Sequence, residues 1–307
     1  MREIPTSAGA APLADLTSRI LPADLRRQLE GLSLGSRRRL ATQGQGDRRS
    51  PLRGNSLQLV DYRPYAPGDD PRQVDWKAFG RSGELFVRLY EDERTLTVHL
   101  LVDVSDSMDW GTPNKRQAAL GLASALAFVA LSSYDRLQIA FLGDRIVGRA
   151  GPFWGPPKRA AALAALAGAP TARQTDLATS VASYVDRIRQ PGILLLITDL
   201  LSPTAEAALR RFASARHETI VLQILAPQEL EPEPAEDVQI VDRETGQTID
   251  VNLDRATIAR YQERLRAWLE SLALLCRERN ARFVRFSSAD DLSHDMTRAL
   301  RLHGILR

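Results

Sequence analysis

Apolar residues along the chain form two alternating patterns. Short unbroken runs of Leu, Ile and Val have the length of one strand and are typical of strands buried on both faces of a sheet. Between them lie longer segments in which apolar residues recur at helical spacing. Strands that alternate with helices predict a mostly parallel sheet with right-handed crossovers. The expected strands are 95–103, 136–142, 193–199, 219–225 and 281–286, with a hairpin over 238–251, and the expected helices are 22–32, 113–133, 158–167, 175–188, 203–216, 254–279 and 290–302.

Three stretches do not fit the succession of strands and helices. In residues 84–91 successive side chains point to opposite sides of a strand, and a charged turn follows. We therefore expect a hairpin that leads into strand 95–103. Residues 144–149 are expected to return as an edge strand that ends before a loop at 151–157. Residues 227–234 are acidic and rich in proline, which predicts a surface loop.

Polar side chains follow the most apolar run directly. Asp103, Ser105 and Ser107 stand at the end of the strand at 96–102, before a helix whose N-cap and first residue are expected at Thr112–Pro113. A turn can aim these alternate residues at one point. In open α/β sheets ligands bind beyond the carboxyl ends of the strands, so this turn is a candidate ligand site. Ser and Asp are also ordinary turn residues, and a purely structural role stays open.

Two further side chains that could supply oxygen ligands follow downstream, one before a predicted helix and one at the end of a predicted strand. Thr175 precedes an amphipathic helix, and Asp199 ends a second buried strand together with Thr198. Carboxylate and hydroxyl oxygens suit a hard divalent cation such as Mg²⁺, which keeps several waters and needs few carboxylates. The candidate ligands for Mg²⁺, or for Mn²⁺, are Asp103, Ser105, Ser107, Thr175 and Asp199.

The order of these residues resembles the metal-ion-dependent adhesion site of von Willebrand factor A domains. That resemblance implies a doubly wound α/β fold in which the listed side chains surround one metal ion, partly through water, and a carboxylate of a partner protein completes the coordination. Two positions depart from the family pattern. Arg173–Gln174 stand where the family often has Gly-Gly, and Leu200 stands where Gly commonly follows the last Asp.

A second set of motifs lies upstream. Arg53–Gly54, the Tyr-Ala-Pro-Gly-Asp-Asp-Pro-Arg run at 65–72, Asp75–Trp76 and the turn at 103–107 together resemble a bacterial domain-of-unknown-function family, DUF58, over roughly residues 50 to 290. Members of that family often accompany MoxR-type AAA+ ATPases, so the resemblance implies such an ATPase as a partner. The Pro-Gly-Asp-Asp run itself can either fix a loop through ion pairs or form a second interaction surface.

These patterns predict three regions. Residues 1–50 are expected to be a mobile basic segment with a short helix, and 51–95 to hold the family signature and a β-hairpin. Residues 96–307 are expected to form the von Willebrand factor A-like domain.

Composition narrows the functional classes. A hydrophobic content of 44% and a charged content of 26% are those of a globular protein, and no run of about 18 apolar residues predicts a membrane span. No secretory pattern opens the chain, so a cytoplasmic location is expected. The net charge is only +3, with the basic excess in residues 1–50. Nucleic-acid binding by that segment stays open as a minor alternative to a solvated tail.

The sequence therefore favours a metal-dependent protein-interaction module, not an enzyme. The alternative is a Mg²⁺-dependent phosphoryl or ester hydrolase that uses the same site. Three absences argue against its common forms: position 105 is Ser where a haloacid-dehalogenase phosphatase needs Asp, and neither a phosphate-binding loop nor a Gly-x-Ser-x-Gly elbow is present. None of the four His residues lies in a catalytic motif.

Overall fold

The computed structural model divides the chain into two compact units. One comprises Met1–Ala41 with Leu96–Arg307, and the other comprises Thr42–Thr95. The signature positions 53–54, 65–72 and 75–76, and the tail before residue 21, lie outside the described residues. The residues described are 21–36, 58–64, 79–80, 85–91, 96–188, 191–213, 217–241, 243 and 246–307.

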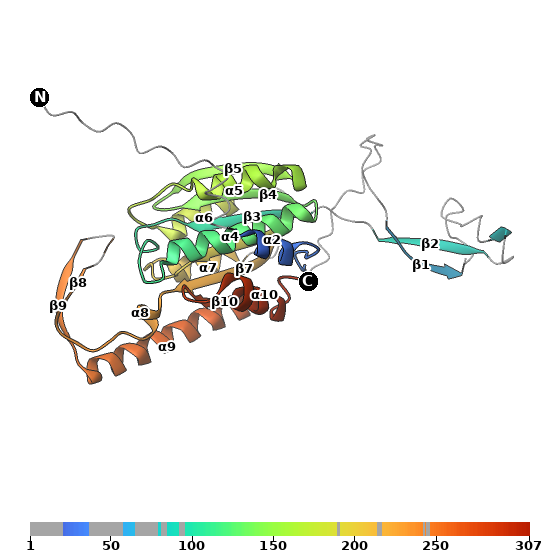
Figure 1. Ribbon diagram of the computed structural model, residues 1–307. Coiled ribbons are helices and arrows are strands. Elements are labelled where there is room, and N and C mark those ends of the chain that lie inside the picture. The colour runs from blue at the N-terminus through green and yellow to red at the C-terminus, as the bar shows by residue number, and fades with distance from the viewer. Residues whose placement is uncertain are drawn as a thin grey trace, which may run out of the picture. The chain divides into compact units, whose positions relative to one another are not determined.

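A six-stranded sheet forms the centre of the larger unit (Figure 1). Five strands are parallel and one edge strand, β5, is antiparallel, which confirms the expected mostly parallel α/β fold. The most apolar runs, which end in the candidate residues, lie at its centre. In order across the sheet the strands are β10 (Arg282–Ser287), β7 (Glu218–Leu225), β6 (Ile193–Thr198), β3 (Thr97–Asp103), β4 (Arg136–Leu142) and β5 (Ile146–Trp154).

Helices cover both faces of this sheet. Leu100 and Val102 of β3 pack into one core and Leu101 into the other, as expected for a strand buried on both faces. The first core contains α2 (Ala23–Leu29), α4 (Lys115–Ser132), α5 (Arg159–Ala167) and α10 (Thr297–Leu302), and the second contains α6 (Leu177–Val185), α7 (Ala205–Phe212) and α9 (Arg255–Glu278). Figure 1 shows α4 and α2 on the near face of the sheet. Among the described residues, no helix is both long and apolar enough to cross a membrane.

The short N-terminal helix belongs to the larger unit. Leu21, Leu25 and Leu29 are almost completely buried in the same core as α4. Ser33 exchanges two backbone hydrogen bonds with Arg307, at 3.1 and 3.0 Å. The sequence did not predict this docking, because three leucines at helical spacing do not say which surface they contact.

Two expectations for the strands are wrong. β2 (Phe86–Glu91) pairs antiparallel with β1 (Gln58–Pro64) and not with β3. Both edges of β3 are taken by its parallel neighbours, so no edge remains for a hairpin partner. β5 is also longer than expected and runs through the predicted loop to Trp154. Pro152 is tolerated there because β5 is an edge strand.

The start of α4 and the structure of residues 227–234 also differ from expectation. α4 begins at Lys115, and its N-cap is Asn114 instead of Thr112, because the Asn114 side chain accepts a hydrogen bond from the Gln117 N–H at 3.1 Å. The expected loop at 227–234 begins with a short helix, α8 (Pro227–Leu230). The expected hairpin beyond it is confirmed as β8 (Ala235–Val241) and β9 (Thr248–Leu253).

Candidate functional site

The candidate residues meet at the carboxyl edge of the two central strands. Asp103 is the last residue of β3, and Asp199 directly follows β6. Because Val102 pairs with Ile197 across these parallel strands, Asp103 lies level with Thr198, and Asp199 follows one residue later at the same edge of the sheet. Both are buried, with 1% and 2% of their surface exposed.

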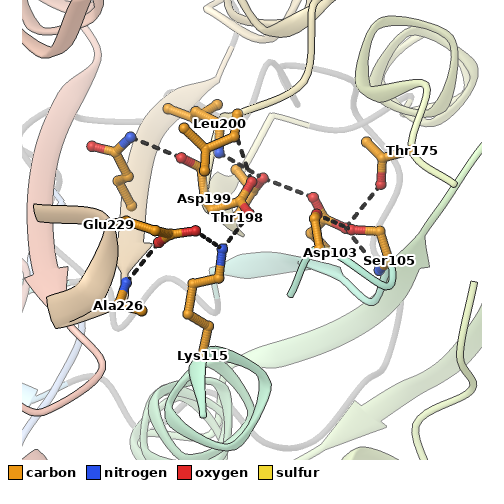
Figure 2. A network of polar contacts seen from close by, with 12 residues as sticks. Asp103, Ser105, Lys115, Thr175, Thr198, Asp199, Leu200, Ala226 and Glu229 are labelled. Carbon is orange, nitrogen blue, oxygen red and sulfur yellow. Dashed lines mark hydrogen bonds and ion pairs between the residues drawn. The ribbon is translucent and has the colours of Figure 1, made fainter. Parts of the chain in front are cut away.

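Asp103 is the centre of a set of hydroxyl groups. Its Oδ1 accepts hydrogen bonds from the Ser105 hydroxyl at 2.7 Å, the Ser105 N–H at 3.0 Å and the Thr175 hydroxyl at 3.1 Å. The Ser107 hydroxyl lies 2.9 Å from that of Ser105. The structure therefore brings Asp103, Ser105, Ser107 and Thr175 together, as Figure 2 shows for Asp103, Ser105 and Thr175.

Backbone pairing brings Thr175 to this place. The Ala172 N–H donates to the Val104 carbonyl at 2.9 Å, so the chain before Thr175 runs beside the turn that follows β3. Gly143 permits this approach, because a Cβ at that position would lie only 2.4 Å from the Ala172 Cβ. Asp176 then caps α6 by accepting from the Thr179 N–H at 3.1 Å. Thr175 therefore reaches Asp103 although Arg173–Gln174 stand where the von Willebrand factor A pattern often has Gly-Gly.

Asp199 faces a different partner. Its Oδ2 lies 2.7 Å from the Nζ of Lys115, and the same ammonium lies 2.6 Å from Oε1 of Glu229 (Figure 2). Its Oδ1 accepts from the Leu201 N–H at 3.0 Å. The residue between them, Leu200, has a φ of 58°, so it adopts the left-handed conformation usually taken by Gly. The side chain of Leu200 is completely buried, which compensates for that conformation.

Thr198 connects Asp103 to the backbone that follows β6. Its hydroxyl donates to Oδ2 of Asp103 at 2.8 Å, so both oxygens of Asp103 accept hydrogen bonds. The same hydroxyl oxygen accepts from the Leu200 N–H at 3.2 Å. Asp103 is therefore held rigidly while Asp199 is held by Lys115.

The site carries an excess of negative charge. Two carboxylates, those of Asp199 and Glu229, share the single ammonium of Lys115, and Asp103 has no cationic partner among the ion pairs of the described residues. Burial, and then the nearby Asp199, raise the pKa of Asp103 above its usual range. Burial alone lowers the pKa of Lys115, but Asp199 and Glu229 outweigh it and raise that pKa. Burial raises the pKa of Glu229, against the opposing effect of Lys115.

The donor set fits a hard cation that needs few carboxylates. Asp103, Ser105, Ser107 and Thr175 supply one carboxylate and three hydroxyls, and a bound cation would relieve the repulsion between Asp103 and Asp199. Within the described part of the chain, no three His, Cys, Asp or Glu side chains cluster so that they could hold a metal ion. A carboxylate-rich or thiolate site is therefore not formed by those residues.

Sequence reasoning missed Lys115 and Glu229. Lys115 is one of only three lysines in a chain with 41 basic residues, and it is the first residue of the helix that follows the Asp103 motif. Only 1% of the Lys115 surface is exposed, and the sequence alone could not predict that this lysine is buried. Glu229 lies in the stretch expected to be a loop, where its Oε2 accepts from the Ala226 N–H at 2.7 Å and so starts α8.

An apolar groove begins next to this network. The ring centre of Trp110 lies 5.9 Å from the Nζ of Lys115. From Trp110 a groove of about 960 Å³ extends between the β8–β9 hairpin and the first turns of α9. Its apolar walls include Val241 and Tyr261, which remain 51% and 40% exposed. This surface offers apolar area beside the buried charges.

Comparison with known proteins places these features in a family. Uncharacterised proteins of Mycobacterium bovis and Mycobacterium tuberculosis are each 28% identical over 261 residues, covering 83% of this chain and 82% of theirs. Among solved structures, BatB from Bacteroides thetaiotaomicron is similar with a TM-score of 0.42 and 17% identity, over 68% of this chain and 98% of that one. An aerotolerance-related membrane protein from Bacteroides fragilis has a TM-score of 0.41 and 18% identity over the same shares.

The family match covers both the segment upstream of the sheet and the candidate site. It extends over residues 61–271, which is more than two thirds of the chain, and it includes Asp103, Thr175 and Asp199. The chain belongs to the family described as protein of unknown function DUF58.

Proposed function

We propose that this protein is a metal-dependent protein-interaction module with a von Willebrand factor A-like domain. The observation that carries the proposal is the cluster around Oδ1 of Asp103, where the hydroxyls of Ser105 and Thr175 converge on a buried carboxylate at the carboxyl edge of the sheet. Mg²⁺ or Mn²⁺ held by Asp103, Ser105, Ser107 and Thr175, with Asp199 behind them, would supply an open coordination position for a carboxylate of the partner.

The residues of the site have distinct roles in this proposal. Asp103 provides the negative charge that attracts the cation, and Thr198 fixes its orientation through the 2.8 Å hydrogen bond. Lys115 neutralises Asp199, so that the cation keeps a net positive charge toward the partner. Few protein carboxylates around the ion favour the binding of one more from outside.

The groove beside Trp110 offers apolar surface that a protein partner would cover. A partner whose acidic side chain reached the metal would place its neighbouring apolar residues against Val241 and Tyr261. Members of the DUF58 family often accompany MoxR-type AAA+ ATPases, so such an ATPase is the partner to test first. We propose that the protein acts as an adaptor of such an ATPase in the cytoplasm.

The decisive experiment measures binding of a purified MoxR-type ATPase to the immobilised protein, with Mg²⁺ or with EDTA. Asp103→Ala removes the central carboxylate, and Asp144→Ala serves as the matched control because Asp144 is an exposed carboxylate in the turn after β4. Binding that requires Mg²⁺ and Asp103 but not Asp144 supports the proposal. Equal binding in EDTA, or by Asp103→Ala, refutes metal-dependent capture. Hydrolysis of a generic phosphate ester that Asp103→Ala abolishes would instead favour an enzyme.

A further inference from the structure

A polar pocket lies at the amino-terminal ends of the central strands, opposite the carboxyl ends that carry the proposed metal-site residues. Its volume is about 330 Å³, and it opens at the amino ends of β3 and β4, where Thr97 and Arg136 begin these strands. Asp103 stands at the other end of β3, about 20 Å away along the strand. The two sites are therefore separate.

Three arginines line this pocket, and they come from different elements. Arg136 belongs to β4 and Arg149 to β5, while Arg187 follows the end of α6. In the described part of the chain none of them forms an ion pair, and none of the described lining residues is acidic. Guanidinium groups that line one pocket without a counter-charge among its lining residues favour a bound anion.

Arg149 is held in place before any ligand binds. Its guanidinium lies over the ring of Tyr184, 5.5 Å from the ring centre. Tyr184 is itself buried, with 5% of its surface exposed. Because the ring fixes the position of the guanidinium, less conformational entropy is lost when an anion binds to it.

Tyr184 also supplies a hydroxyl donor. Its oxygen lies 2.9 Å from Nδ1 of His99, whose Nε2 is buried without a hydrogen-bond partner. Burial, followed by the nearby His217 and Arg136, lowers the pKa of His99 to about 4, so the imidazole is neutral at pH 7. A buried N–H without a partner costs more than an unpartnered acceptor, which places the proton on Nδ1. Nδ1 then donates to Tyr184, and the Tyr184 O–H remains available to a ligand.

We propose that this pocket binds a phosphate group, held by the guanidiniums of Arg136, Arg149 and Arg187 and by the Tyr184 hydroxyl. Guanidinium groups bind phosphate oxygens in pairs, and their planar donors match its geometry. The volume exceeds that of the phosphate group alone and lies at the lower limit for small-ligand pockets, so a small phosphomonoester fits as well as the free ion. Gln138 adds a neutral polar side chain to the wall.

Isothermal titration calorimetry of the full chain tests this proposal. Inorganic phosphate and adenosine 5′-monophosphate are titrated separately in EDTA, at constant ionic strength with chloride as the balancing anion. We expect saturable binding that weakens about tenfold in Arg149→Gln and in Arg187→Gln, and that is lost in the double variant. Tighter binding of the monophosphate identifies an ester as the ligand, whereas equal or weaker binding identifies the free ion, and each result supports the phosphate site.

Arg285→Gln is the matched control, because it removes an exposed arginine from β10, the opposite edge strand. It should bind phosphate as the wild type does, and so should Asp103→Ala, which separates this pocket from the proposed metal site. Arg149→Lys keeps the charge but loses the paired donors, and intermediate affinity is expected. The absence of saturable binding, or undiminished binding by the folded double variant, would overturn the proposal.

Discussion

The ammonium of Lys115 lies 2.7 Å from a carboxylate oxygen of Asp199, and both side chains are almost completely buried. One of the two acidic residues of the candidate site therefore has a permanent cation of the protein beside it. The other, Asp103, has only hydroxyl and backbone donors. In the proposed metal site, this asymmetry makes Asp103 the carboxylate that would attract a cation, while Lys115 holds Asp199.

Replacement of Lys115 by Met should destabilise the protein strongly. The change keeps the length of the side chain but leaves the carboxylates of Asp199 and Glu229 without their cation. Removal of one partner from a buried ion pair costs about 3–5 kcal/mol in free energy of unfolding. Urea denaturation measures this value. Lys158→Met is the control, since Lys158 is exposed and its replacement should change stability by less than about 0.5 kcal/mol. Equal stability of the two variants would contradict the structural role of Lys115.

Thr198→Val should lower stability and loosen Asp103. The substitution is nearly isosteric, but it removes the donor to Oδ2 of Asp103 and the acceptor for the Leu200 N–H. An unsatisfied buried group costs about 1–3 kcal/mol, which equilibrium unfolding can resolve. Thr248→Val, on the exposed side of β9, makes the same chemical change at a solvated position and should have little effect. If both valine variants unfold at the same urea concentration, the Thr198 hydroxyl does not restrain Asp103.

Asp135 should make the protein more stable at low pH than at neutral pH. Burial raises the pKa of Asp135 from 3.8 to about 7 in the folded state, although its carboxylate accepts from the Leu96 N–H at 2.9 Å. Between these two values the folded state holds a proton that the unfolded state releases, so the free energy of unfolding falls as the pH rises from about 4 to 7. The difference over this window is about 4 kcal/mol.

The measurement compares wild type with Asp135→Asn by urea denaturation across that pH range. Asparagine keeps an acceptor for the Leu96 N–H but does not titrate, so the variant should gain stability relative to wild type as the pH rises. Asp186→Asn, at an exposed position, is the control and should not show this trend. A constant difference between wild type and Asp135→Asn at every pH would show that Asp135 does not titrate in this window.

Mg²⁺ should raise the melting temperature through Asp103. A ligand that binds only the folded state stabilises it in proportion to the logarithm of its concentration above the dissociation constant. Asp103→Asn keeps the shape of the side chain and removes its charge, so the Mg²⁺-dependent shift should disappear. Asp144→Asn should retain that shift. Melting curves of all three proteins that do not respond to Mg²⁺ or Mn²⁺ would show that the cluster is a structural turn.

The sequence predicted best those features that depend on residues close together along the chain. The apolar run of β3 and the polar residues directly after it defined a central strand and a candidate site, and the structure brings Asp103, Ser105, Ser107 and Thr175 into contact. These contacts follow from two rules, that parallel strands end at one edge and that alternate turn residues share a side.

Contacts between distant segments were not predictable in this way. Lys115 and Glu229 are 114 residues apart, and no pattern along the chain indicates that their side chains meet. The pairing of β2 with β1 was missed for a related reason, since alternation identifies a strand but not its neighbour. The left-handed Leu200 also escaped prediction, because only packing of its side chain against the second core permits that conformation.

The residues just before the signature segment are held against the C-terminal end of the larger unit, because Ser33 pairs with Arg307. Ser36 donates to Glu218 at the start of β7, and Leu96 enters β3 at the same amino edge of the sheet. Ser36 and Leu96, the described residues on either side of the signature segment, therefore both belong to one folded body. A Gly-Ser linker in place of residues 42–95 should leave that body able to fold, because Met1–Ala41 and Leu96–Arg307 form one compact unit.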